Sequence, residues 1–146
     1  MDIMKAGMMV GMKPWIIINE KKEKKDMTNL EIYNIATNLA EAFRDNTQKL
    51  PVKVNFFLQK NKKTLIALAQ EIEEARLDIA KKYGTLDIES GSYAVEAENV
   101  EVAQKDLANL FNIDQQVDIK MISYDDIDPD MELTTAQMEA LLFMIE

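Results

Sequence analysis

The acidic segment Asp125–Glu132 is the part of the chain whose residue types and spacing come closest to a metal site. Its alternating carboxylates, Asp126, Asp128 and Asp130, match the start of a calcium-binding EF-hand loop. The match then fails, because a methionine stands where that loop needs a glycine and a glutamine where it needs a bidentate glutamate. We therefore expect no metal and no cofactor, and interpret the segment as a solvated loop beside a helix N-terminus. Neutralising Asp126 and Asp128 together should change the free energy of unfolding by less than about 1 kcal/mol.

A second acidic group lies in a stretch with helical periodicity and comprises Glu71, Glu73, Glu74 and Asp78. A carboxylate metal site in a helical bundle needs inward-facing acids, usually with histidine partners. The chain contains no histidine, and these acids flank the apolar positions rather than replace them. We interpret them as a solvent face with helical contacts to Arg76 and Lys82.

The one basic concentration outside the N-terminal region comprises Lys49, Lys53, Lys60, Lys62 and Lys63, with Phe56 and Phe57 among them. Lysines with exposed aromatic rings are typical of nucleic-acid binding. The formal net charge of −9 opposes binding to a polyanion, so we expect no nucleic-acid partner. A small anionic ligand such as a nucleotide, held by Lys49, Lys53 and Tyr33, stays open as an alternative function.

The composition excludes several classes of enzyme. The 146 residues include no cysteine and no histidine, which rules out thiolate nucleophiles, histidine-based triads and zinc sites built on these residues. Gly84 and Gly91 are the only glycines after residue 26, so no glycine-rich phosphate loop can be formed there. We expect a protein that is not an enzyme; the remaining enzymatic alternative is divalent-metal chemistry at Asp125–Asp130.

The first 26 residues differ in composition from the rest of the chain. They hold five of the ten methionines and the only tryptophan, and they end in a dense run of charges, Glu20–Asp26. Lys13 and Pro14 interrupt the apolar part, which makes it too short to span a membrane, so we expect no membrane association. We interpret the charge run as solvated chain.

Met27 has the features of a natural start. The codons for Lys22 and Glu23 consist of purines and can form a ribosome-binding sequence shortly before it, and a helix begins immediately after it. We predict that residues 1–26 are an extension, that 27–146 form a single domain, and that a chain starting at Met27 is as stable as the whole. The alternative is an extension that docks Trp15–Ile18 as an extra strand.

Periodicity in the rest of the chain predicts four helices and three short strands. The helices are expected over 28–45, where Thr28 and Glu31 form a capping box, over Pro51–Tyr83 with Gly84 as its C-terminal cap, over 99–112, and from Thr134 or Thr135 onward. The strands are expected over 85–88 and 92–95, joined in a hairpin, and over 117–121. The predicted fold class is α+β and mostly helical: a long central helix in a helical hairpin, two further helices, and a small antiparallel sheet of the hairpin plus one strand.

The long helix carries a coiled-coil-like seam. Its members are Leu58, Leu65, Ile72 and Ile79, seven residues apart, with Leu68 between them. A helix of this length spans about 50 Å, whereas a compact domain of this size is about 35 Å across. We therefore predict an antiparallel homodimer through these five residues. The alternative is a bundle within one chain, with a curved helix.

A set of local motifs carries a resemblance to a known family. In order, they are Leu50–Val54 opening the long helix, Ala75-Arg76 and Lys81–Gly84 closing it, a glycine-turn hairpin, Val117–Ile119, an acidic link, Leu133-Thr134, and a last helix from Met138 to Met144-Ile145. In this order and spacing, 27–146 resembles a family of small proteins from tailed phages and prophages of Gram-positive bacteria, classified as a domain of unknown function. That family has no assigned catalytic residue, so the resemblance brings no active site to this chain.

The resemblance implies a phage or prophage origin and synthesis in the cytoplasm of a bacterial host. Together with the missing catalytic groups and the apolar seam, it favours a non-enzymatic accessory protein that acts through protein–protein interaction. Such a protein would assist assembly, form a minor component of the virion, or bind a phage or host protein.

Overall fold

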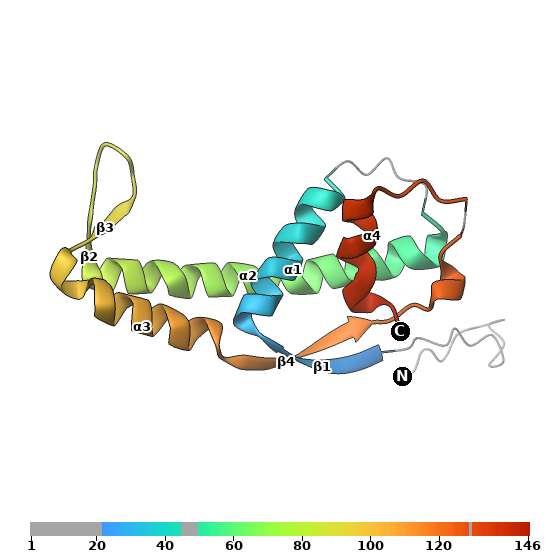
Figure 1. Cartoon of the computed structure of the whole chain (residues 1–146), viewed down its shortest axis with the longest axis horizontal. Helices are drawn as coiled ribbons and strands as arrows, with labels where there is room; N and C mark the ends of the chain where they lie inside the picture. Colours follow the sequence, from blue (N-terminus) through green and yellow to red (C-terminus); the bar gives the residue numbers. More distant parts are fainter. Residues whose placement is uncertain (1–21, 45–49, 129) are drawn as a thin grey trace, which may run out of the picture.

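The computed structural model describes residues 22–44, 50–128 and 130–146 and has the predicted class, α+β and mostly helical (Figure 1). The helices are α1 (Asn29–Ala42), α2 (Val52–Tyr83), α3 (Val100–Phe111) and α4 (Thr135–Leu141); the strands are β1 (Lys22–Thr28), β2 (Gly84–Leu86), β3 (Tyr93–Val95) and β4 (Asp114–Lys120). Short 3₁₀ turns precede α3, follow β4 and follow α4.

Helix α2 organises the molecule. Its 32 residues span about 48 Å, and they contain neither glycine nor proline. In Figure 1, α1 and α4 lie across the N-terminal half of α2, whereas α3 runs back along the C-terminal half and the β2–β3 hairpin projects sideways from the C-terminal end of α2. We call residues 73–109 the arm and the other described residues the body.

The body contains the hydrophobic core. The side chains that are fully buried include Ile32, Leu39, Leu58, Leu65, Ile119, Leu141 and Met144, from α1, α2, β4, α4 and the turn that follows α4. Both predicted caps are confirmed: the hydroxyl oxygen of Thr28 accepts the amide of Glu31, and that of Thr134 accepts the amide of Gln137. These caps start α1 and α4 at the positions that let their apolar faces meet α2.

Strand β1 is not the solvated chain that the charge run predicted. Residues 22–28 pair antiparallel with β4, Lys22 opposite Lys120 and Thr28 opposite Asp114. The pairing is compatible with so many charges because only one face of the ribbon is covered: Val117 and Ile119 are buried, whereas Asp118 between them is exposed. The alternative docking segment, Trp15–Ile18, lies outside the described residues.

The sheet topology also differs from the prediction. The strand that follows α3 was expected to join the hairpin in one sheet, but β1–β4 and β2–β3 form two separate sheets of two strands. The reason is the direction of α3, which carries the chain from the hairpin back to the body before β4 begins (Figure 1). The two ends of α3 are too far apart for β4 to reach β2 or β3.

Buried amides tie the elements of the body together. Asn61 on α2 is 1% exposed; its Nδ2 donates to the carbonyl of Lys120 at 3.0 Å, and its Oδ1 accepts the amide of the same residue at 2.9 Å. Asn29 donates to the carbonyl of Leu110, and Gln137 to that of Ala42. Within the described ranges, no buried side-chain polar atom lacks a partner. These bonds fix where β4, α3 and α4 meet the rest of the body.

The arm has no comparable core. Ala103 is its only buried side chain, and polar contacts supply much of the connection between α2 and α3. The hydroxyl of Tyr83 donates to Asp106 at 2.6 Å, and Nδ2 of Asn99 donates to the carbonyl of Tyr83 at 3.3 Å. The arm is therefore held by one layer of contacts along α2.

Gly84 is the C-terminal cap of α2, as predicted, and joins α2 to the hairpin. Its backbone is extended, with φ −129° and ψ 175°. A Cβ at this position would lie 2.8 Å from the carbonyl oxygens of both Ala80 and Ala94. Glycine is needed here because the chain passes between two backbone segments that leave no room for a side chain.

Candidate interaction surfaces

The residues of the predicted seam lie mostly inside the chain. Leu58, Leu65 and Ile72 are 1%, 0% and 3% exposed, and Leu68 and Ile79 are partly buried. The elements that pack against α2 include α1, α3 and β4. In this conformation the three buried residues are not accessible to a second copy, so the exposed stripe from which the dimer was predicted is not present on this face.

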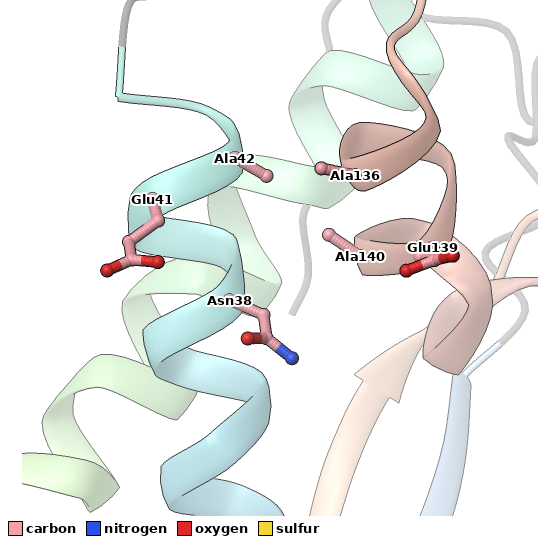
Figure 2. Close-up of a pocket in the computed structure, with 6 residues that line it drawn as sticks. All are labelled: Asn38, Glu41, Ala42, Ala136, Glu139 and Ala140. Carbon is pink, nitrogen blue, oxygen red and sulfur yellow. The ribbon is translucent and has the colours of Figure 1, made fainter.

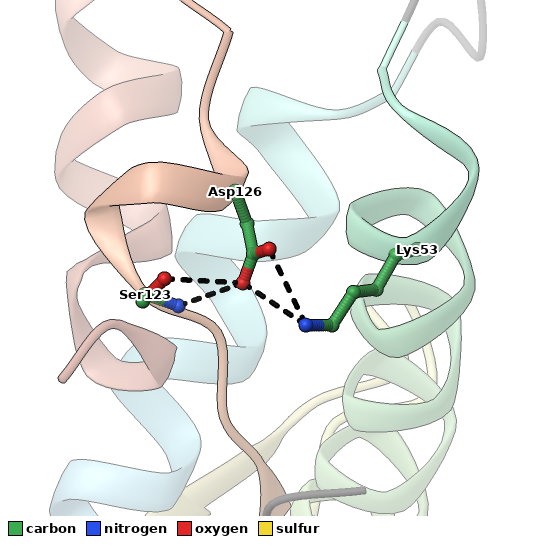
Figure 3. Close-up of polar contacts among 3 residues, drawn as sticks. All are labelled: Lys53, Ser123 and Asp126. Atoms are coloured by element: carbon green, nitrogen blue, oxygen red, sulfur yellow. Dashed lines mark hydrogen bonds and ion pairs between the residues drawn. The ribbon is translucent and has the colours of Figure 1, made fainter. Parts of the chain in front are cut away.

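Asp126, the first metal candidate, has a structural role (Figure 3). Its Oδ2 accepts the backbone amide of Ser123 at 2.9 Å and the Ser123 hydroxyl at 3.4 Å, and Nζ of Lys53 lies 3.2 Å away. The Ser123 amide and the Lys53 ammonium lower the pKa of Asp126 below its ordinary value of 3.8, against the opposing effect of burial. Asp126 thus caps the turn after β4 and ties it to the start of α2.

The other two candidates do not join Asp126 in a site. Oδ1 of Asp128 accepts the amide of Asp130 at 2.9 Å, a local turn, and both residues are exposed. No group of three or more acidic side chains in the described part of the chain is placed to hold a metal ion. The acidic loop is therefore built by hydrogen bonds to its own backbone.

The acidic side chains on α2 do not form a common site either. Glu73 accepts two bonds from Nε of Arg76, at 3.0 and 3.1 Å, and one from the hydroxyl of Tyr33 at 3.3 Å. Arg76 is the main reason that the pKa of Glu73 is lowered. The predicted contact with Arg76 is confirmed for Glu73, whereas Lys82 lies 3.8 Å from Asp106 on α3.

The residues proposed to hold an anionic ligand are not gathered in one place. Lys53 is paired with Asp126 and Tyr33 with Glu73, while Lys49 lies outside the described residues. Lys60 lies over the ring of Phe56, with Nζ 5.1 Å from its centroid, and Phe56 is 52% exposed. The basic end of α2 therefore exposes an aromatic ring and a cation on its outward side rather than a cluster around a cavity.

A shallow groove of about 270 Å³ separates α1 from α4 (Figure 2). It is lined by Asn38, Glu41, Ala42, Ala136, Glu139 and Ala140. The alanines face each other across its floor, whereas the two carboxylates point outward to opposite sides. Because no two ionisable groups converge on a common point, the groove offers no acid–base pair.

The end of the arm exposes apolar side chains. Ile88 in the turn of the hairpin is 89% exposed and Leu86 is 48% exposed, and on α3 Val100 and Val102 are 38% and 46% exposed. The turn itself is closed by local bonds, including the amide of Asp87 to the carbonyl of Ser92 at 2.8 Å. The apolar residues are thus presented on an ordered hairpin rather than used to fold it.

The sequence reasoning missed a second exposed surface on α2, opposite the seam. We call it the outer stripe; its residues recur at three- and four-residue spacing and are all exposed: Val52, Phe56, Lys60, Lys63, Ala67, Gln70, Glu74, Leu77 and Lys81. Because the seam held most of the apolar residues, the opposite face was assigned to solvent. The signal that was overlooked is the order of charges around its centre, because Lys60 and Lys63 precede Ala67 and Glu74 follows it, before Lys81 ends the stripe.

Comparison of the chain with protein-family models, with curated proteins and with solved structures finds no match to any of them. Among residues 22–44, 50–128 and 130–146, no helix combines the length and the apolar character needed to cross a membrane.

Proposed function

We propose that this protein is a non-enzymatic interaction protein that binds another protein through the end of its arm. The observation that carries the proposal is the exposure of Leu86 and Ile88 on the hairpin, in an arm that also exposes Val102 on α3. Apolar side chains that gather on a projecting element, away from the core, are typical of a binding surface. A partner that covered them would also supply the second layer of packing that the arm lacks.

The surroundings of the hairpin suit a partner with a basic rim. Asp87, Glu89 and Glu96 are exposed on or beside the hairpin, and none of them has an ion-pair partner among the described residues. Charges at the edge of an apolar contact steer association more than they add to affinity. We therefore expect binding to weaken and slow as salt concentration rises.

The setting that we propose is a tailed phage or prophage of a Gram-positive bacterium. Its support is the family resemblance in the order and spacing of the motifs across 27–146. In that setting the partner is a phage structural or assembly protein, or a host protein, met in the bacterial cytoplasm or on the virion. Phage structural genes on both sides of the coding sequence are the expected observation; an unrelated chromosomal neighbourhood would contradict this origin.

The binding proposal is tested by comparing what purifies with three tagged chains. The first is wild type, the second carries Leu86→Ser with Ile88→Ser, and the third carries Leu142→Ser, a matched loss of an exposed leucine (51%) on the body. We expect one partner to be retained by the first and third and lost by the second, because only the second removes the apolar end of the arm. Equal recovery by all three would contradict the proposal.

A further inference from the structure

The charges of the outer stripe of α2 are ordered so that two copies of the stripe are complementary when they run in opposite directions. Lys60 and Lys63 precede Ala67 and Glu74 follows it, so the charge of this exposed helix face changes sign at Ala67 in the central part of the stripe; Lys81 lies at the end of the stripe, outside that part. Glu71 and Asp78, which flank the acidic half, are exposed as well. Among the described residues, none of these acids and neither lysine has an ion-pair partner.

We propose that the outer stripe binds a second copy of this chain, with the two α2 helices antiparallel about a twofold axis beside Ala67. In that arrangement residues equally far from Ala67 on opposite sides face each other. Lys60 and Glu74 are each seven residues from Ala67, which is two helical turns, so each lysine meets the glutamate of the other copy. One twofold axis forms this pair twice.

The apolar residues of the stripe fit the same register. Phe56, 52% exposed, is eleven residues before Ala67 and Leu77, 37% exposed, is ten residues after it, so the two side chains are offset by only one residue near both ends of the contact. Ala67 at the centre has a small side chain, which lets the two helix backbones approach closely. Two large exposed apolar residues therefore become covered, while the smallest residue lies where the helices cross.

A parallel pair is excluded by the same charges. It would place Lys60 against Lys60 and Glu74 against Glu74, and like charges across a helix interface oppose association. The exposed face is thus complementary to a second copy only in one orientation. This inference is independent of the proposed function, because it uses the face of α2 opposite the seam and leaves the hairpin free.

The first test is charge reversal, read out as molecular mass by sedimentation at about 10 to 100 µM. Wild type should be a dimer, and Lys60→Glu or Glu74→Lys alone should raise its dissociation constant at least about tenfold. The double variant Lys60→Glu with Glu74→Lys should return to within about threefold of wild type, because it exchanges the two charges of each pair. A monomeric wild type, or a double variant weaker than either single variant, would overturn the proposal.

The second test uses the absence of cysteine from the chain. Ala67→Cys places two thiols beside the twofold axis and should form a disulfide between copies under mild oxidation. Lys60→Cys should not, because its two copies lie about 20 Å apart in the antiparallel pair. Crosslinking of both variants would indicate a parallel pair, and crosslinking of neither would place any dimer elsewhere; either result overturns the proposal. Ala40→Cys, exposed on α1, controls for random collision.

Discussion

Body and arm share helix α2, but they use its inner face differently. In the body, where α1 and β4 pack against α2, Leu58 and Leu65 are almost completely buried. In the arm, where α3 and the β2–β3 hairpin pack against α2, the same heptad continues to Ile79, which stays partly exposed. A heptad pattern therefore identifies which face of a helix packs against the rest of the protein. How much each residue of that face contributes to stability depends on how many helices and strands cover it.

The largest contrast is expected in hydrogen exchange. Amides of α3, which has one buried side chain, should exchange at least about a hundred-fold faster than amides of α1, because opening the arm exposes little apolar surface. Hydrogen–deuterium exchange followed by mass spectrometry measures both helices in one sample. Equal protection of α1 and α3 would show that the arm is as stable as the body and would contradict the predicted difference in stability between them.

The second contrast is between two truncations on the same face of α2. Leu65→Ala should reduce the free energy of unfolding by about 3 kcal/mol, because it leaves a cavity in a closed core. Ile79→Ala should cost about 1 kcal/mol, since its site is partly open to solvent and can collapse. Denaturant unfolding of both variants gives the difference; a larger loss for Ile79→Ala would reverse the comparison.

The third prediction concerns the edge of the body. A chain starting at Met27 loses the partners of residues 116–120 in β4 and the bond from Nζ of Lys25 to the carbonyl of Phe143. We now expect it to be about 2 kcal/mol less stable than a chain starting at Lys22, which keeps β1. Thermal unfolding of the two chains tests this directly. Equal stability would favour the sequence-based expectation that Met1–Asp26 lie outside the domain.

The smallest effect is expected at the turn after β4. Asp126→Ala should cost about 1 kcal/mol at pH 7, because it removes the cap on Ser123 and the pair with Lys53. Asp125→Ala, a neighbouring exposed acid, is the matched control.

The pH dependence of that effect has a definite sign. The pKa of Asp126 is lower in the folded chain than its ordinary value of 3.8, so its stabilisation is fully present above that value and is lost as pH falls through the folded-state pKa. The gap between wild type and Asp126→Ala should therefore shrink as pH falls below 3.8. A gap that is constant with pH would show that the charge of Asp126 has no role.

Local signals in the sequence were sufficient to predict the positions of the helices. Thr28 and Thr134 mark the starts of α1 and α4, and an uninterrupted helical pattern runs to Tyr83, because capping and periodicity depend only on residues a few positions apart. The class of the fold followed from these elements. What the sequence did not contain was the position of one element against another.

The failures all concern contacts between distant parts of the chain. The charges of Lys22–Asp26 were interpreted as solvent-exposed because the strand they pair with, β4, lies about 90 residues further along the chain. Asp126 resembled the start of a metal loop because its partner Lys53 is on another element. The outer stripe was missed because apolar periodicity selects the buried face and says nothing about how charges are ordered on the exposed one.

The pairing of β1 with β4 also sets an order of events during folding. Its partners are about 90 residues apart in the chain, whereas those of β2 and β3 are about 10 apart. Closing a long loop costs more entropy than closing a short one, so α2, the hairpin and α3 can come together before the ends meet. On the ribosome β1 emerges first and must wait for β4, the last strand to be made. We therefore expect the arm, whose strands pair over a short stretch of chain, to form early and the β1–β4 ribbon to complete the native structure.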